Sequence, residues 1–135
     1  MGRRCRYPPI RVAPPALPRY AFVGAPRMIA KVAERKQKQV DRIRTAVATV
    51  EPSLADYARR HGGRFVVFGS AARGDLHHDS DYDLMVDFAL PIEREARDFA
   101  ERLCIDAGLR PDVHLKLDLS AALLERIVRD GRVLQ

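Results

Sequence analysis

Long apolar stretches are missing from this chain, since no run approaches the roughly 18 residues that a membrane-spanning helix needs. Cysteine is scarce as well, with only Cys5 and Cys104. Two cysteines in such different contexts give neither a disulfide framework nor metal-binding spacing, and they favour a reducing compartment. A length of 135 residues fits one domain with its own core. We therefore expect a single soluble domain in the cytoplasm.

Acidic residues are absent from residues 1–28, which hold six arginines and six of the nine prolines. Because prolines at this density exclude a helix, we predict a disordered basic extension there. It is either a basic arm for a partner or the result of start-site choice, with Met28 as the natural start. Six of the 24 basic side chains belong to it, and the 18 that remain equal the 18 acidic ones. Direct nucleic-acid binding by the folded part is therefore not expected.

Four helices are predicted from the spacing of apolar residues. Residues 29–50 repeat apolar positions every three or four residues opposite a mostly basic face, the pattern of an amphipathic helix. Pro52 is expected to end this helix, and a second one is expected from Leu54 to His61. A third helix is predicted over residues 92–107, and a fourth is expected after its capping residue Ser120.

Three strands are predicted between and after these helices. Residues 65–68 are continuously apolar, residues 81–88 alternate, and residues 112–119 alternate more regularly. Val133 and Leu134 either form a short final strand or pack without one. The order of elements predicts an α/β (α+β) domain over residues 29–135, with a three- to four-stranded mixed sheet and helices mainly on one face. The polar faces of the second and third strands would line an open surface.

Carboxylates gather on the second and third strands. Asp81 and Asp83 are two positions apart, so they point to the same side of the sheet. Two adjacent negative charges are unfavourable unless a cation lies between them, and oxygen ligands on an open surface suit Mg²⁺ or Mn²⁺. Asp112 can join them if the two strands are neighbours. Three such carboxylates can hold two ions that activate an attacking oxygen and stabilise a leaving phosphate.

A Gly-Ser turn follows the first strand, at Gly69 and Ser70. Glycine allows the backbone to approach a phosphate closely, and Ser70 can donate from its hydroxyl and its amide. The helical turn that follows presents free N–H groups to an anion, and Arg73 adds charge or braces the loop. Alone, an Asp-x-Asp pair is usually a solvated strand edge and Gly-Ser a simple turn. Together they predict nucleotidyl transfer from a triphosphate.

The segment FGSAARGDLHHDSDYDLMVDF, residues 68–88, resembles the signature of the minimal nucleotidyltransferases, small members of the DNA polymerase β superfamily. Their pattern of Gly-Ser, ten residues and Asp-x-Asp fits without a gap at Gly69, Ser70, Asp81 and Asp83. The resemblance runs from about Ala30 to the C-terminus and is specific over residues 64–88. It implies ATP as substrate, Mg²⁺ as cofactor and a HEPN-domain toxin as partner. In such pairs the nucleotidyltransferase is the antitoxin and transfers AMP to a tyrosine of the toxin.

Two residues can supply the third carboxylate, because Asp112 and Asp118 share one face of the predicted third strand. They are six residues apart, about 20 Å along a strand, so only one can join the pair. We choose Asp112 and expect Asp83 to bridge both ions. His114 would lie beside Asp112, where it either assists catalysis or points to solvent. His77 and His78 are interpreted as surface residues.

Two rival functions stay open. The first is a non-catalytic antitoxin that neutralises its partner by covering it, although the complete acidic set argues against this as the sole function. The second is nucleotidyl transfer to a small molecule such as an aminoglycoside. That reaction generally needs a second domain to shape the acceptor pocket, and this chain has few residues to spare.

Overall fold

The computed structural model describes the backbone of residues 20–135 and the side chains of residues 29–135. It divides into two compact units, residues 1–34 and residues 35–135. The described part of the first unit is helical, and the second unit contains the whole sheet. No helix among the described residues is both long enough and apolar enough to cross a membrane.

Helix α1 (Tyr20–His61) begins earlier than the sequence predicted. The predicted extension over residues 1–28 therefore overlaps the helix from Tyr20 on, and its first 19 residues lie outside the described part of the chain. Five of the six prolines of that segment precede Tyr20. The proline density that excludes a helix therefore does not apply to residues 20–28.

The predicted break at Pro52 is wrong, because α1 continues through it to His61. A proline at this position removes the hydrogen bond to the carbonyl of Ala48. Both residues lie on the exposed side of the helix, where water can bind that carbonyl. On the opposite side Val50 and Leu54 are fully buried. Burial on both sides of the proline outweighs the local cost of about 3 kcal/mol.

Four strands form one mixed sheet in the order β3-β2-β1-β4. Their bounds are β1 (Arg64–Phe68), β2 (Tyr82–Asp87), β3 (Pro111–Leu115) and β4 (Arg132–Leu134). Strand β1 is antiparallel to β2 and β4, whereas β2 and β3 are parallel. The α+β fold and the mixed sheet are confirmed, and the final residues do form a short fourth strand.

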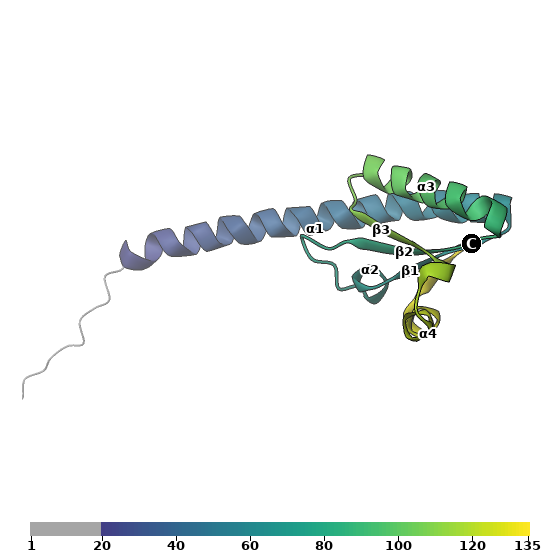
Figure 1. Cartoon of the computed structure of the whole chain (residues 1–135). Coiled ribbons are helices and arrows are strands. Elements are labelled where there is room, and N and C mark those ends of the chain that lie inside the picture. The colour runs from purple at the N-terminus through teal and green to yellow at the C-terminus, as the bar shows by residue number, and fades with distance from the viewer. Residues whose placement is uncertain (1–19) are drawn as a thin grey trace, which may run out of the picture. The chain divides into compact units, whose positions relative to one another are not determined.

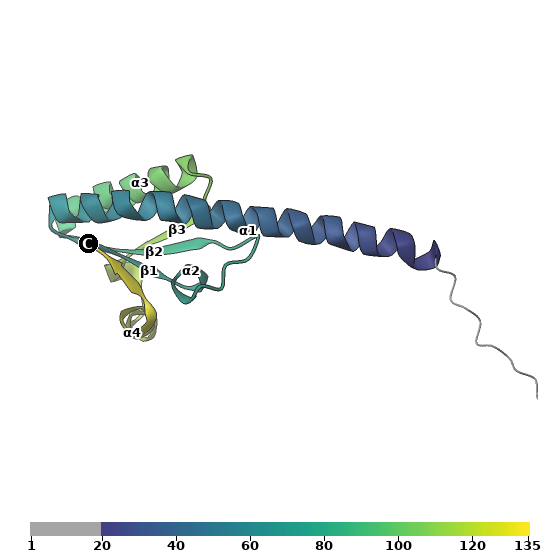
Figure 2. The same cartoon turned by 180° about the vertical axis from the view of Figure 1, so that it is seen from behind.

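Helices cover both faces of this sheet, one more fully than the other (Figures 1 and 2). The part of α1 in the second unit and α3 (Leu90–Asp106) pack on one face with the larger core. Helix α4 (Ala121–Asp130) covers part of the other face, and its N-cap Ser120 accepts a hydrogen bond from the Leu123 amide as expected. Met85, expected on an open polar face, is fully buried there beside Ile127. Only part of that face is therefore open.

Strand β3 is shorter than predicted, since it ends at Leu115 and a 3₁₀ helix, η1 (Lys116–Asp118), follows. Its partner β2 ends one residue after Val86, the residue that pairs with Leu115, so little strand remains for a longer ladder. The predicted core residue Leu117 is 72% exposed. Asp118 therefore lies off the strand, beyond the end that is remote from Asp112.

Candidate active site

Three segments that the sequence singled out meet at one end of the sheet. Strand β1 ends there, and the parallel strands β2 and β3 begin there. The register places Asp83 between Phe68 on β1 and Asp112 on β3. The condition that the second and third strands be neighbours is met, and Gly69 follows Phe68 directly.

Asp83 and Asp112 form a close pair of like charges. Burial and the negative charge of Asp112 together raise the pKa of Asp83 from 3.8 to about 6, and Asp81 adds to the rise. Burial is the larger cause, because it withdraws water from the ionised form. The folded protein therefore holds two carboxylates that repel each other near neutral pH. A cation between them would remove this repulsion.

Gly69 lies directly against Asp83. Its φ of 70° falls in the left-handed region, and a Cβ atom there would overlap Oδ2 of Asp83. Glycine is therefore required both by the backbone conformation and by the close approach of the carboxylate. Ser70 opens the short helix α2 (Ser70–Arg73), which confirms the predicted helical turn. The exposed Arg73 braces the loop, with Nε 3.4 Å from Oδ2 of Asp75.

Asp81 pairs with a guanidinium. Its Oδ1 lies 3.4 Å from Nε of Arg110, the residue that precedes β3. Among residues 29–135 no three His, Cys, Asp or Glu side chains are arranged to hold a metal ion. The predicted set is thus a contacting pair, Asp83 and Asp112, with Asp81 held beside it by a guanidinium.

His114 contacts Asp112 instead of pointing only to solvent, with Nε2 3.1 Å from Oδ1. Its ring lies beside Phe68, 5.9 Å between centroids. Asp112 therefore has a carboxylate on one side and an imidazole on the other. His77 and His78 are exposed, as interpreted from the sequence.

A buried tyrosine supports the start of β2 from the other face of the sheet. The Tyr82 hydroxyl donates to Oε1 of Glu51 at 3.3 Å, and the same carboxylate pairs with Arg132. Tyr82, which lies between Asp81 and Asp83 in the sequence, is almost completely buried. It thereby fixes the backbone that carries both aspartates. Alternation predicts its inward direction, but no sequence signal links it to Glu51 or Arg132.

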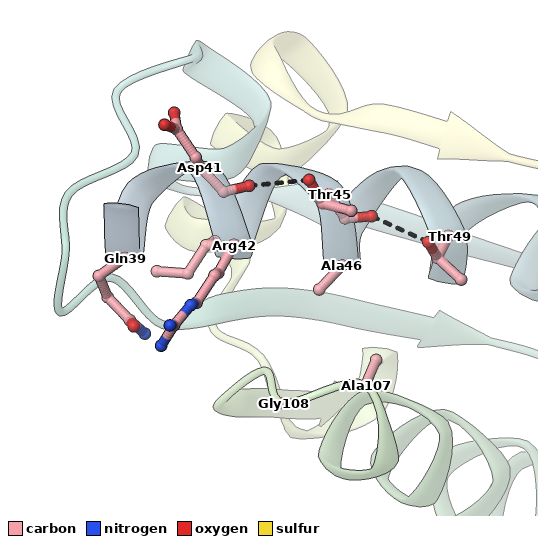
Figure 3. Close-up of a pocket in the computed structure, with 9 residues that line it drawn as sticks. Gln39, Asp41, Arg42, Thr45, Ala46, Thr49, Ala107 and Gly108 are labelled. Atoms are coloured by element: carbon pink, nitrogen blue, oxygen red, sulfur yellow. Dashed lines mark hydrogen bonds between the residues drawn. The ribbon is translucent and has the colours of Figure 1, made fainter. Parts of the chain in front are cut away.

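Another hollow of about 670 Å³ lies between α1 and the end of α3 (Figure 3). None of the predicted site residues lines it. The hydroxyls of Thr45 and Thr49 donate to carbonyls of their own helix at 2.9 Å, so their donors are occupied. Arg42 is its one basic side chain, and Asp41 points to the other side of the helix in Figure 3. Its lining contains no paired carboxylates comparable to Asp83 and Asp112.

A model of the nucleotidyltransferase domain matches residues 47–134, about two thirds of the chain. The match includes all of the segments that meet at the end of the sheet. This chain belongs to the nucleotidyltransferase domain family. The resemblance drawn from residues 68–88 is confirmed at that level.

Individual nucleotidyltransferases are also similar to this chain. The protein adenylyltransferase MntA of Thermococcus cleftensis is 35% identical over 65 residues, which cover 47% of this chain and 66% of that protein, just under two thirds of its length. A solved minimal nucleotidyltransferase is 28% identical, with coverage of 64% of this chain and 90% of the other and a TM-score of 0.49. A crystal structure of a toxin–antitoxin with AMP-PNP is 24% identical, with coverage of 63% and 72% and a TM-score of 0.48.

The donors at the end of this nucleotidyltransferase sheet suit a hard divalent cation. Carboxylate oxygens are the ligands that Mg²⁺ and Mn²⁺ prefer, and a one-sided site leaves positions for water and phosphate. Burial and the neighbouring Asp112 raise the pKa of Asp83, and a bound cation would favour its ionised form. Asp81 can serve as a third ligand once it leaves Arg110. The residues present therefore fit such an ion.

Proposed function

We propose that this nucleotidyltransferase transfers AMP from ATP to a hydroxyl group of a partner protein, and that it acts as an antitoxin in the cytoplasm. The observation that carries the proposal is the pairing of Asp83 with Asp112 directly beside Gly69, in a chain of this family. The similar protein from Thermococcus cleftensis is named a protein adenylyltransferase, which supports a protein acceptor.

The predicted site residues divide into those that bind the triphosphate and those that would bind metal. Gly69 and Ser70 hold the triphosphate through the close backbone turn, with Arg73 as a further positive charge. Three carboxylates, Asp81, Asp83 and Asp112, would hold Mg²⁺ or Mn²⁺, which would supply positive charge beside the triphosphate. The bound ions would offset the negative charge of the triphosphate and of the departing pyrophosphate.

The proton of the acceptor hydroxyl goes to Asp112. This carboxylate is more than half exposed, at 54%, so an incoming side chain can reach it. The freed oxygen bonds to the α-phosphorus of ATP while the bond to pyrophosphate breaks. Most of the rate enhancement then comes from orientation and charge compensation, because phosphoryl-type transfer asks little covalent chemistry of the protein.

The acceptor is a tyrosine of a HEPN-type toxin in this proposal. This assignment is supported by the motif at residues 68–88, which resembles antitoxins of such pairs. The protein encoded by the neighbouring reading frame is therefore the first acceptor to test. Neutralisation by covering alone and transfer to a small molecule are the outcomes that would replace it.

Transfer is tested with ATP labelled at the α-phosphate and the purified neighbouring protein. We expect the label on that protein with the wild-type chain, and none when the label is on the γ-phosphate. The double variant Asp81→Asn and Asp83→Asn should abolish labelling while circular dichroism stays unchanged. Asp118→Asn is the matched control, since Asp118 is an exposed carboxylate off the strand, and should label normally.

Undiminished labelling by the double variant would refute the assigned site. Neutralisation of the partner by the double variant without labelling would support covering as the mechanism. Label on an added aminoglycoside but on no protein would move the reaction to small molecules.

A further inference from the structure

Arg110 forms an ion pair with Asp81, one of the three predicted metal-binding carboxylates. Within residues 29–135 no other arginine contacts any of these three carboxylates. The Nε of Arg110 lies 3.4 Å from Oδ1 of Asp81. The two side chains are 70% and 52% exposed, so the pair is open to solvent and to ions. A contact of this kind is easily exchanged for another cation.

The backbone holds Arg110 in this place. Its carbonyl accepts a hydrogen bond of 2.8 Å from the amide of Tyr82, which follows Asp81 directly. Tyr82 in turn is buried and bonded to Glu51. The backbones of Arg110 and Asp81 are therefore held near each other. This proximity favours the pairing of their side chains, although both are exposed.

Charge at this end of the sheet makes the pairing consequential. Asp81 lies two residues before Asp83, which is paired in register with Asp112 on the neighbouring strand. A guanidinium bound to Asp81 partly neutralises it and occupies oxygen that a metal ion would need. A divalent cation must therefore compete with Arg110 for the same carboxylate.

We propose that Arg110 is a positioning residue that keeps Asp81 paired with its guanidinium until a divalent ion displaces it, an inference that rests on the proposed function of these carboxylates. Arg110 thereby lowers the affinity of the site for metal. The carboxylate set is completed by exchange of Asp81 from the guanidinium to the ion.

Binding of Mn²⁺ without nucleotide tests this directly, because free Mn²⁺ is measured by electron paramagnetic resonance without any turnover. We expect Arg110→Gln to tighten Mn²⁺ binding by about two- to five-fold, the size that an exposed ion pair allows. Arg110→Lys keeps a cation beside Asp81 and should stay near the wild-type affinity. Arg94→Gln is the charge-matched control, since Arg94 is exposed near the start of α3, towards the opposite end of the sheet, and should change nothing.

A double-mutant comparison separates a direct effect of Arg110 from a general loss of positive charge. In an Asp81→Asn background, Arg110→Gln should no longer alter Mn²⁺ affinity, because the carboxylate through which Arg110 acts is gone. An equal gain in both backgrounds would overturn the proposal, since the effect would then bypass Asp81.

The remaining outcomes distinguish this inference from the proposed function. Unchanged or weaker Mn²⁺ binding by Arg110→Gln, with weaker binding by Asp81→Asn, overturns the role of Arg110 and leaves the site intact. Unchanged Mn²⁺ binding by a folded Asp81→Asn variant would show that Asp81 is not a metal ligand. That result would refute both the role of Arg110 and the proposed set of three metal-binding carboxylates.

Discussion

The two ends of strand β2 carry the same residue type in opposite surroundings. At its far end Asp87 lies 2.7 Å from Nε of Arg64 and 3.5 Å from Nζ of Lys116. Near its beginning Asp83 faces another carboxylate, Asp112, and its pKa rises. The protein supplies the cations for Asp87 from its own side chains. At Asp83 it gathers negative charge, which a bound cation would compensate.

The comparison also separates stability from function. Asp87, which is paired with basic side chains, contributes to the stability of the fold. Two neighbouring carboxylates such as Asp83 and Asp112 lower that stability in the absence of a cation. Natural proteins accept such costs mainly where chemistry requires them. This is why we assign the active site to the end with Asp83 rather than to the end with Asp87.

The largest effect on stability is expected from a methyl group at Gly69. Gly69→Ala adds the strain of φ 70° to an overlap with Asp83 and should lower the free energy of unfolding by about 2–3 kcal/mol. Gly62→Ala is its matched control, because Gly62 has φ 71° but open space at its Cβ position. It should lose only about 1 kcal/mol. Urea unfolding measures both, and equal losses would show that Asp83 does not crowd Gly69.

Removing the charged carboxylate at either end of β2 should change the free energy of unfolding by less, and with opposite signs at the two ends. With chelator at pH 7.5, Asp83→Asn should stabilise the protein by about 1 kcal/mol, a figure reduced for solvent screening since Asp83 is partly buried. Asp87→Asn should destabilise it by about 1 kcal/mol, because Arg64 and Lys116 lose their partner. Denaturant titration of both variants gives the signs.

The pH dependence of stability should also differ between the wild type and Asp83→Asn. Because the pKa of Asp83 is raised to about 6 in the folded protein, its contribution is full below about pH 4 and is lost as pH rises through 6. The metal-free wild type should therefore lose this increment of stability over that interval, and Asp83→Asn should not. A loss of the same size in both would place the titrating group elsewhere.

The arrangement at the Asp83 end of β2 was largely predictable from sequence, because short-range patterns determine it. Alternation gave the direction of Asp83, and the Gly-Ser turn marked the end of β1. The pairing with Asp112 required only that β2 and β3 be neighbours. Each of these features depends on a few adjacent residues, so the sequence pattern contains it.

Features that depend on distant partners were not predictable. Pro52 lies within α1 because Val50 and Leu54 are buried against the sheet, and β3 stops because β2 does. Met85 is buried because α4 returns to cover it. The contact of Arg110 with Asp81 depends on a side-chain direction at the turn before a parallel strand, which no periodicity indicates.

We infer that the carboxylates at the Asp83 end of β2 need a bound cation to compensate their charge, whereas Asp87 at the other end does not. Thermal unfolding with chelator and with millimolar MgCl₂ tests it most directly. At about ten times the dissociation constant, Mg²⁺ should raise the Tm of the wild type and of Asp87→Asn by about 5 °C. The Tm of Asp83→Asn should stay unchanged. An equal rise in Asp83→Asn, or no rise in the wild type, would contradict the account.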